Sequence, residues 1–134
     1  MPFIRIGHFD DFKGSKTLPI ECDDEGLRTL IELIRDVATS GEPSILERHP
    51  DVIACGAVGI SLERSVDDVG LIAGSDRNFV WRRSSQAWAT IVAKLLAMQG
   101  VGPAHQYLDG SADILQVIVA IGEYGEPWWS SHTA

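Results

Sequence analysis

The stretch Thr17-Leu-Pro-Ile-Glu-Cys-Asp-Asp-Glu-Gly-Leu27 decides the fold, because an extended apolar run passes there directly into a helix. Asp23 or Asp24 can cap that helix, since a carboxylate at this position accepts hydrogen bonds from the backbone N–H groups of the first turn. The pair Ser40-Gly41, followed by Pro43, is a typical end of a helix. Between these limits, apolar residues recur at the spacing of one helical face: Leu27, Leu30, Ile31, Ile34 and Ala38.

The same order of strand, helix and strand returns in the second half of the chain. Alternation over 57–63 predicts a half-buried strand, and a turn then leads into a strand over 69–73, so we expect a hairpin to join the two halves. A second helix is expected to begin near Ser84 or Ser85. The run Ile114-Leu-Gln-Val-Ile-Val-Ala-Ile121 is so continuously apolar that we place it at the centre of a sheet.

This order of elements predicts an α+β fold in one domain, residues 1–134. The pattern β-α-β-β-α-β indicates a ferredoxin-like arrangement, with two helices on one face of an antiparallel sheet and extra strands at the edges. We expect the strand Leu18–Cys22 near a sheet edge, because Pro19 cannot donate a hydrogen bond to a strand ladder. The other face of the sheet is expected to be open and available for a ligand or a partner.

The charge of the chain limits the classes of partner. The 19 acidic and 11 basic residues give a formal net charge of −8, which repels nucleic-acid backbones and favours a basic protein partner. Neither a leader pattern nor a run of roughly 20 apolar residues is present, so we expect a cytoplasmic protein without a membrane segment. In that reducing compartment Cys22 and Cys55 are expected to be free thiols.

The common signatures of catalysis and metal binding are missing from the sequence. It has no G-x-S-x-G elbow, no P-loop and no G-x-G-x-x-G fingerprint. His105, Tyr107 and Asp109 would alternate onto one face of a strand, but the first and last would stand about 13 Å apart, which is too far to share a metal ion. The pairs Asp10-Asp11 and Asp67-Asp68 are typical turn formers. We therefore expect no metal, no cofactor and no enzyme activity.

Two acidic segments are candidates for contact with a basic partner. One is Asp23-Asp24-Glu25, and the other is the tail Gly122-Glu-Tyr-Gly-Glu-Pro-Trp-Trp129, in which acids accompany large aromatic side chains. Aromatic residues are favoured anchors of protein interfaces. In an alternative interpretation of the tail, its two tryptophans fold back onto the open end of the core. The candidate partner-binding residues are Asp23, Asp24, Glu25, Glu123, Glu126, Trp128 and Trp129.

Two passages resemble small immunity proteins of bacterial polymorphic or contact-dependent toxin systems. The passage Ile20-Glu-Cys-Asp-Asp-Glu-Gly-Leu27, running into Leu30 and Leu33, is similar to their strand-to-helix opening. The passage His105-Gln-Tyr-Leu-Asp109 resembles a His-aromatic-Leu segment near the end of some of these families. The resemblance implies an acidic cytoplasmic protein that neutralises a cognate toxin by direct binding, without catalysis of its own. A basic toxin domain would be steered onto a chain of charge −8.

Two other functions are compatible with the sequence. A small ligand-binding domain or enzyme would use a pocket on the open sheet face, with His105, Tyr107 and Asp109 as its polar lining. A structural homodimer would instead pair through an exposed edge or face of the sheet. A pocket would be concave and moderately apolar, whereas a surface that binds a toxin would be broad and acidic.

Overall fold

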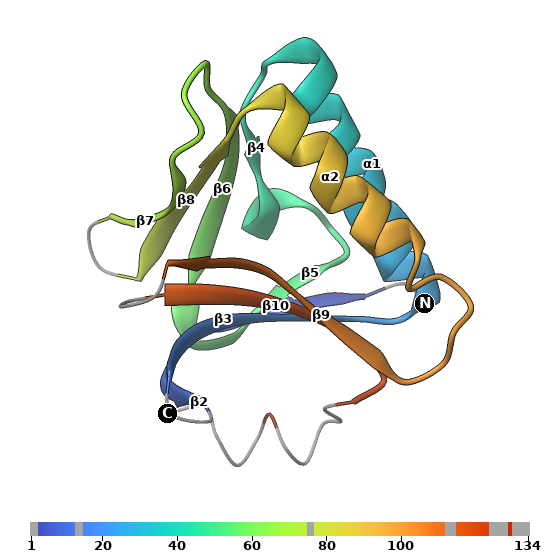
Figure 1. The fold of residues 1–134 in the computed structure, drawn as a ribbon. Helices are drawn as coiled ribbons and strands as arrows, with labels where there is room; N and C mark the ends of the chain where they lie inside the picture. Colours follow the sequence, from blue (N-terminus) through green and yellow to red (C-terminus); the bar gives the residue numbers. More distant parts are fainter. Residues whose placement is uncertain (1–2, 13–14, 75–76, 112–114, 124–128, 130–134) are drawn as a thin grey trace.

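Two sheets and two helices surround the hydrophobic core in the computed structural model, which describes residues 3–12, 15–74, 77–111, 115–123 and 129. The helices are α1 (Asp24–Ser40) and α2 (Ser85–Leu96). They lie side by side over the larger sheet, and the smaller sheet stands beside them (Figure 1). The coarse α+β class is therefore confirmed. Within the described residues, neither helix is long and apolar enough to cross a bilayer.

The larger sheet has six strands of mixed orientation: β1 (Ile4–Ile6), β2 (Phe9–Phe12), β3 (Ser15–Cys22), β5 (Val52–Ala54), β9 (Ala104–Ser111) and β10 (Leu115–Ile121). Their order is β5-β1-β3-β10-β9, and β2 also pairs with β3. The pairs β1–β5 and β3–β10 are parallel, while β1–β3 and β9–β10 are antiparallel. The apolar strand β10 lies between β3 and β9, so its predicted central place is confirmed.

The smaller sheet has the order β4-β6-β8-β7 and consists of β4 (Ser44–Ile45), β6 (Gly59–Arg64), β7 (Gly70–Ala73) and β8 (Asn78–Arg83). The predicted hairpin between 57–63 and 69–73 is wrong, because β8 lies between β6 and β7. β8 pairs in parallel with β6 and antiparallel with β7. The structure thus has two mixed sheets in place of the single antiparallel sheet that the sequence predicts. Two short 3-10 helices connect the sheets along the chain: η1 (Leu46–Arg48) lies between β4 and β5, and η2 (Cys55–Ala57) lies between β5 and β6.

Pro19 lies in an inner strand, so the predicted edge position of Leu18–Cys22 is also wrong. β3 pairs with β10 on one side and with β1 and then β2 on the other. The carbonyl of Pro19 accepts a hydrogen bond from the Gly7 N–H at 3.2 Å, and Gly7 lies between the end of β1 and the start of β2. The N–H and C=O of a strand residue point to the same neighbouring strand. The N–H that Pro19 lacks would therefore point to the break between β1 and β2, where no ladder bond is required.

The two helices form as their sequences predict. Asp23 caps α1 by accepting a hydrogen bond from the Gly26 N–H at 2.6 Å, and Gly41 ends the helix with a φ of 78°. Ser84 caps α2 through the N–H of Ala87. Trp81 of β8 and Trp88 of α2 are fully buried, and their rings pack edge to face at 4.9 Å. This contact connects the smaller sheet to the helix layer.

Both cysteines are free thiols, as the sequence predicts. Cys22 is fully buried at the end of β3, and that burial raises the pKa of its thiol. It packs as a small apolar residue of the core.

Candidate functional site at one end of the larger sheet

Two acidic segments that lie far apart in the sequence leave the larger sheet at the same end. β3 and β10 are parallel, and Cys22 lies opposite Ile121 in their register. Asp23 therefore follows β3 at the level where Gly122 follows β10, and neighbouring strands are about 4.8 Å apart. Asp51 belongs to the same end, since its carbonyl accepts a hydrogen bond from the Ile4 N–H at 2.8 Å. We call this group the acidic end: Asp23, Asp24, Glu25, Asp51 and Glu123.

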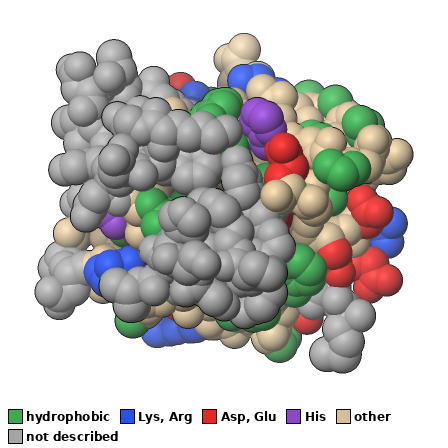
Figure 2. All heavy atoms as spheres, turned by 90° about the horizontal axis from the view of Figure 1, so that it is seen from below, with side chains coloured by type: hydrophobic (Ala, Val, Ile, Leu, Met, Phe, Trp, Pro, Cys, Tyr) green, Lys and Arg blue, Asp and Glu red, His purple; other side chains and the backbone are tan. Residues whose placement is uncertain are grey.

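Two carboxylates of the acidic end are open to a partner, and a third, that of Glu123, contacts His105 and has 27% of its side chain exposed. Asp24 and Glu25 are exposed, whereas Asp23 and Asp51 are half-buried. In Figure 2 acidic side chains gather on the right of the face seen from below, the side on which α1 begins in Figure 1. The positive end of the α1 dipole favours the carboxylates of its first turn.

Asp23 has a structural role within this group. Its carboxylate accepts hydrogen bonds from the Gly26 N–H at 2.6 Å and from the Phe3 N–H at 3.1 Å. It therefore joins the first turn of α1 to the residue before β1. Gly26 makes this approach possible, because a Cβ at this position would overlap the carbonyl oxygen of Phe3. The carboxylate of Asp23 and the missing side chain of Gly26 thus hold the start of α1, with its acidic residues, close to the sheet.

The structure brings together residues that the sequence assigned to different candidate sites. His105 in β9 lies opposite Ala120 in β10, and its Nδ1 contacts the Glu123 carboxylate. The Tyr107 ring lies against the His105 ring, edge to face, with 5.7 Å between centroids. Both side chains are exposed, and His105 thus extends the acidic end along β9. The strand register that creates this contact cannot be derived from local sequence patterns.

The remaining candidate residues have different places. Trp129 is only 2% exposed. For this tryptophan, the structure therefore favours folding back onto the protein and disfavours a role as an interface anchor. Glu126 and Trp128 lie outside the described residues. The backbone of Asp109 pairs with Val117, but its side chain is outside the described part of the chain. No pocket that joins His105, Tyr107 and Asp109 is therefore established.

The sheet face that the sequence left open is covered over the central strands. Trp129 packs on this face beside β1, with its ring 5.8 Å from the Phe9 ring and 5.6 Å from the Arg5 guanidinium. A Cβ on Gly7 would lie 2.8 Å from the Trp129 ring. Four residues of β3 and β10 on the same face are at most 2% exposed: Thr17, Glu21, Ile118 and Ala120. The prediction of an open sheet face is therefore wrong for the middle of this sheet.

The basic residues of β8 form ion pairs with acidic residues of β6 and of the connection between β6 and β7. Arg82 donates to Glu63 of β6 at 3.0 Å and 3.1 Å, and Arg83 pairs with Asp68. Asp68 is thus bound to a guanidinium and is not part of a cation site. Among the described residues, no group of three or more His, Cys, Asp or Glu side chains is arranged to hold a metal ion.

The Asp68–Arg83 pair predicts a pH dependence. Hydrogen bonds from Arg83 hold the pKa of the Asp68 carboxyl below its ordinary value of 3.8. The pair therefore stabilises the fold above that ordinary value, and this contribution is lost as the pH falls through the folded-state pKa. We expect Arg83→Met to raise the Asp68 pKa toward 3.8, as measured by NMR titration of the carboxyl carbon. Arg82→Met, which removes a neighbouring guanidinium, is the control; an equal shift in both variants would contradict the assignment.

No protein-family model matches the chain, and a search of curated proteins finds no significant match.

Proposed function

We propose that this protein is an immunity protein, an acidic cytoplasmic protein that neutralises a cognate bacterial toxin by binding it directly. One observation carries the proposal, namely the convergence of Asp24, Glu25 and Glu123 at one end of the larger sheet. The exposed carboxylates of Asp24 and Glu25, together with that of Glu123, which contacts His105, form a surface that matches lysine and arginine side chains of a basic toxin domain. The resemblance of the Ile20–Leu27 and His105–Asp109 passages to immunity proteins supports the same function.

The charge distribution also suits rapid capture of such a partner. A net charge of −8 attracts a basic domain over roughly one Debye length, which is about 8–10 Å at physiological salt. Attraction of this kind mainly accelerates association and weakens as the salt concentration rises. A toxin that attacks nucleic acid has a basic active surface of its own, and the acidic end would compete with the nucleic acid for it.

The first step of the test identifies the partner by its dependence on the acidic end. Tagged protein is used to capture partners from a lysate of the encoding cells at low and high salt. The test variant carries Asp24→Asn, Glu25→Gln and Glu123→Gln. The control carries Glu32→Gln, Asp36→Asn and Glu42→Gln, which removes the same charge from exposed positions further along and beyond α1. We expect one basic protein to bind the natural chain and the control, and to bind less at high salt.

The second step measures binding and protection. The affinity of the test variant for the captured domain should fall by about tenfold or more, since exposed ion pairs contribute up to about 1 kcal/mol each. Bacteria that express the captured domain should stop growing, and co-expression of the natural chain or the control should restore growth. A captured domain that binds all three proteins equally, or whose toxicity the natural chain does not relieve, would contradict the proposal.

A further inference from the structure

A cavity of about 430 Å³ opens between α2, β9 and the end of β8, away from the acidic end. Pockets for small molecules usually have volumes of about 300–1,000 Å³ and combine apolar walls with a few polar groups. Two buried side chains, Ile91 of α2 and Leu108 of β9, contribute apolar surface to the lining. The volume of this solvent-open groove lies in that range, and the exposed edges of Ile91 and Leu108 give it a small apolar patch.

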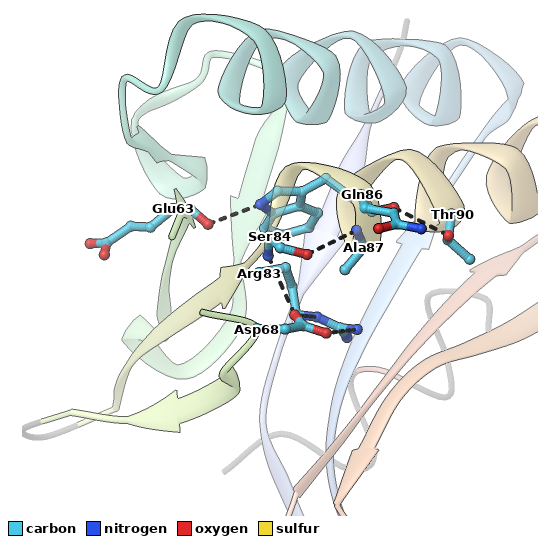
Figure 3. A network of polar contacts seen from close by, with 8 residues as sticks. Glu63, Asp68, Arg83, Ser84, Gln86, Ala87 and Thr90 are labelled. Atoms are coloured by element: carbon cyan, nitrogen blue, oxygen red, sulfur yellow. Dashed lines mark hydrogen bonds and ion pairs between the residues drawn. The ribbon is translucent and has the colours of Figure 1, made fainter. Parts of the chain in front are cut away.

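A polar stripe of α2 forms the other part of the lining. Gln86, Thr90 and Lys94 follow one another at intervals of four residues and so lie on one side of the helix. Thr90 donates its hydroxyl proton to the Gln86 carbonyl at 3.2 Å, which leaves its oxygen able to accept (Figure 3). From Gln86 to Lys94 the stripe extends along about 12 Å of helix, at 1.5 Å per residue. A ligand in the cavity would lie along this stripe.

The charges at the cavity are matched at one end and unmatched at the other. Asp68 and Arg83 form a two-point ion pair, with N···O distances of 2.5 Å and 3.0 Å, and Asp68 also accepts from the Ser84 N–H at 3.3 Å (Figure 3). Lys94, in contrast, has no ion pair with any residue that the structure describes. Lys94 thus leaves its ammonium group available at the cavity for an anion from outside.

We propose that this cavity binds a small organic carboxylate, with its charged group on Lys94 and its apolar body on Ile91 and Leu108. The ammonium group of Lys94 supplies three donors and a full charge to the carboxylate. The Asp68–Arg83 pair lines the opposite end, where its matched charges leave no unpaired cation for a second anionic group. The site thus favours a compact monoanion with an aromatic or aliphatic body. It is independent of the acidic end and of any toxin.

The test is an NMR titration of the ¹⁵N-labelled full chain with benzoate at constant ionic strength. Benzoate has one carboxylate and an apolar ring, and benzamide has nearly the same shape without the charge. We expect benzoate to shift the backbone amides of Thr90, Ile91, Lys94 and Leu108, with a Kd in about the millimolar range for so small a ligand. Benzamide should shift them at least about tenfold less at equal concentration, because it lacks the charge-assisted hydrogen bond to Lys94.

Two matched variants make the test specific. Lys94→Met keeps most of the length of the side chain and removes its charge at an exposed position, so the fold should persist and benzoate should bind about fivefold more weakly. Arg35→Met removes one exposed charge from α1 and should bind benzoate like the natural chain. The proposal is overturned if Lys94→Met binds benzoate unchanged, if benzamide binds equally well, or if no cavity residue shifts at about 50 mM benzoate.

Discussion

Replacement of Trp88 by alanine is expected to lower the free energy of unfolding by about 3–5 kcal/mol. The Trp88 side chain is fully buried between α2 and the smaller sheet, and its ring packs against Trp81. Its indole Nε1–H donates to the Glu63 carbonyl at 2.9 Å, which ties the helix to β6 (Figure 3). Alanine removes the apolar contacts and leaves that carbonyl without this donor. Such a loss is a large part of the roughly 5–15 kcal/mol that holds a domain folded.

Urea unfolding followed by far-UV circular dichroism measures this effect without depending on tryptophan fluorescence. Trp88→Phe keeps part of the ring contact and loses the hydrogen bond, so its effect should be smaller than that of Trp88→Ala. Thr90→Ala, at an exposed position of the same helix, should change stability by less than about 0.5 kcal/mol. A loss below about 1 kcal/mol for Trp88→Ala would show that the core does not depend on this contact.

Replacement of Gly26 by alanine is expected to destabilise the protein by about 1–3 kcal/mol. The direction is unusual, because Gly to Ala within a helix normally stabilises by about 0.5–1 kcal/mol. Here the new Cβ would overlap the Phe3 carbonyl oxygen and lie 2.8 Å from the carbonyl carbon. Both atoms belong to the backbone that leads into β1, so the strand or the helix must move. That movement would also break the hydrogen bond from the Phe3 N–H to Asp23.

Urea unfolding gives the stability change, and the chemical shift of the Phe3 amide reports the broken hydrogen bond. Thr39→Ala adds alanine near the other end of α1 at an exposed position and should not destabilise the protein. If Gly26→Ala were more stable than the natural chain, the close approach of α1 to β1 would not constrain the fold. The variant also tests the acidic end, since partner binding should weaken when the start of α1 shifts.

The sequence predicts the two helices well because their signals are local. Asp23, Gly41 and Ser84 occupy the cap positions that their residue types indicate. Capping requires contacts within one turn, and the helical period is set by the backbone, so neither depends on the rest of the chain. The alternation of Val58, Ile60 and Leu62 likewise predicts the buried face of β6 correctly. Such patterns record which side of an element is apolar.

Strand partners follow from contacts that no local pattern contains. β8 is inserted between β6 and β7, although the turn between 64 and 70 is typical of a hairpin. Pro19 suggests an edge strand, but a break between β1 and β2 provides a place for it inside the sheet. These arrangements depend on the assembly of the whole core, because pairing is stabilised only when the apolar faces of strands and helices are buried together.

The same division applies to the candidate sites. By itself, the sequence determined the net charge, the helix caps and the acidic segments, since each is a property of neighbouring residues. Only the tertiary structure placed Glu123 beside His105 and at the same end of the sheet as Asp24. It also buried Trp129 and opened the cavity beside Lys94. The physical reason is register: a shift of one residue between β3 and β10 would turn every side chain of the shifted strand to the other face.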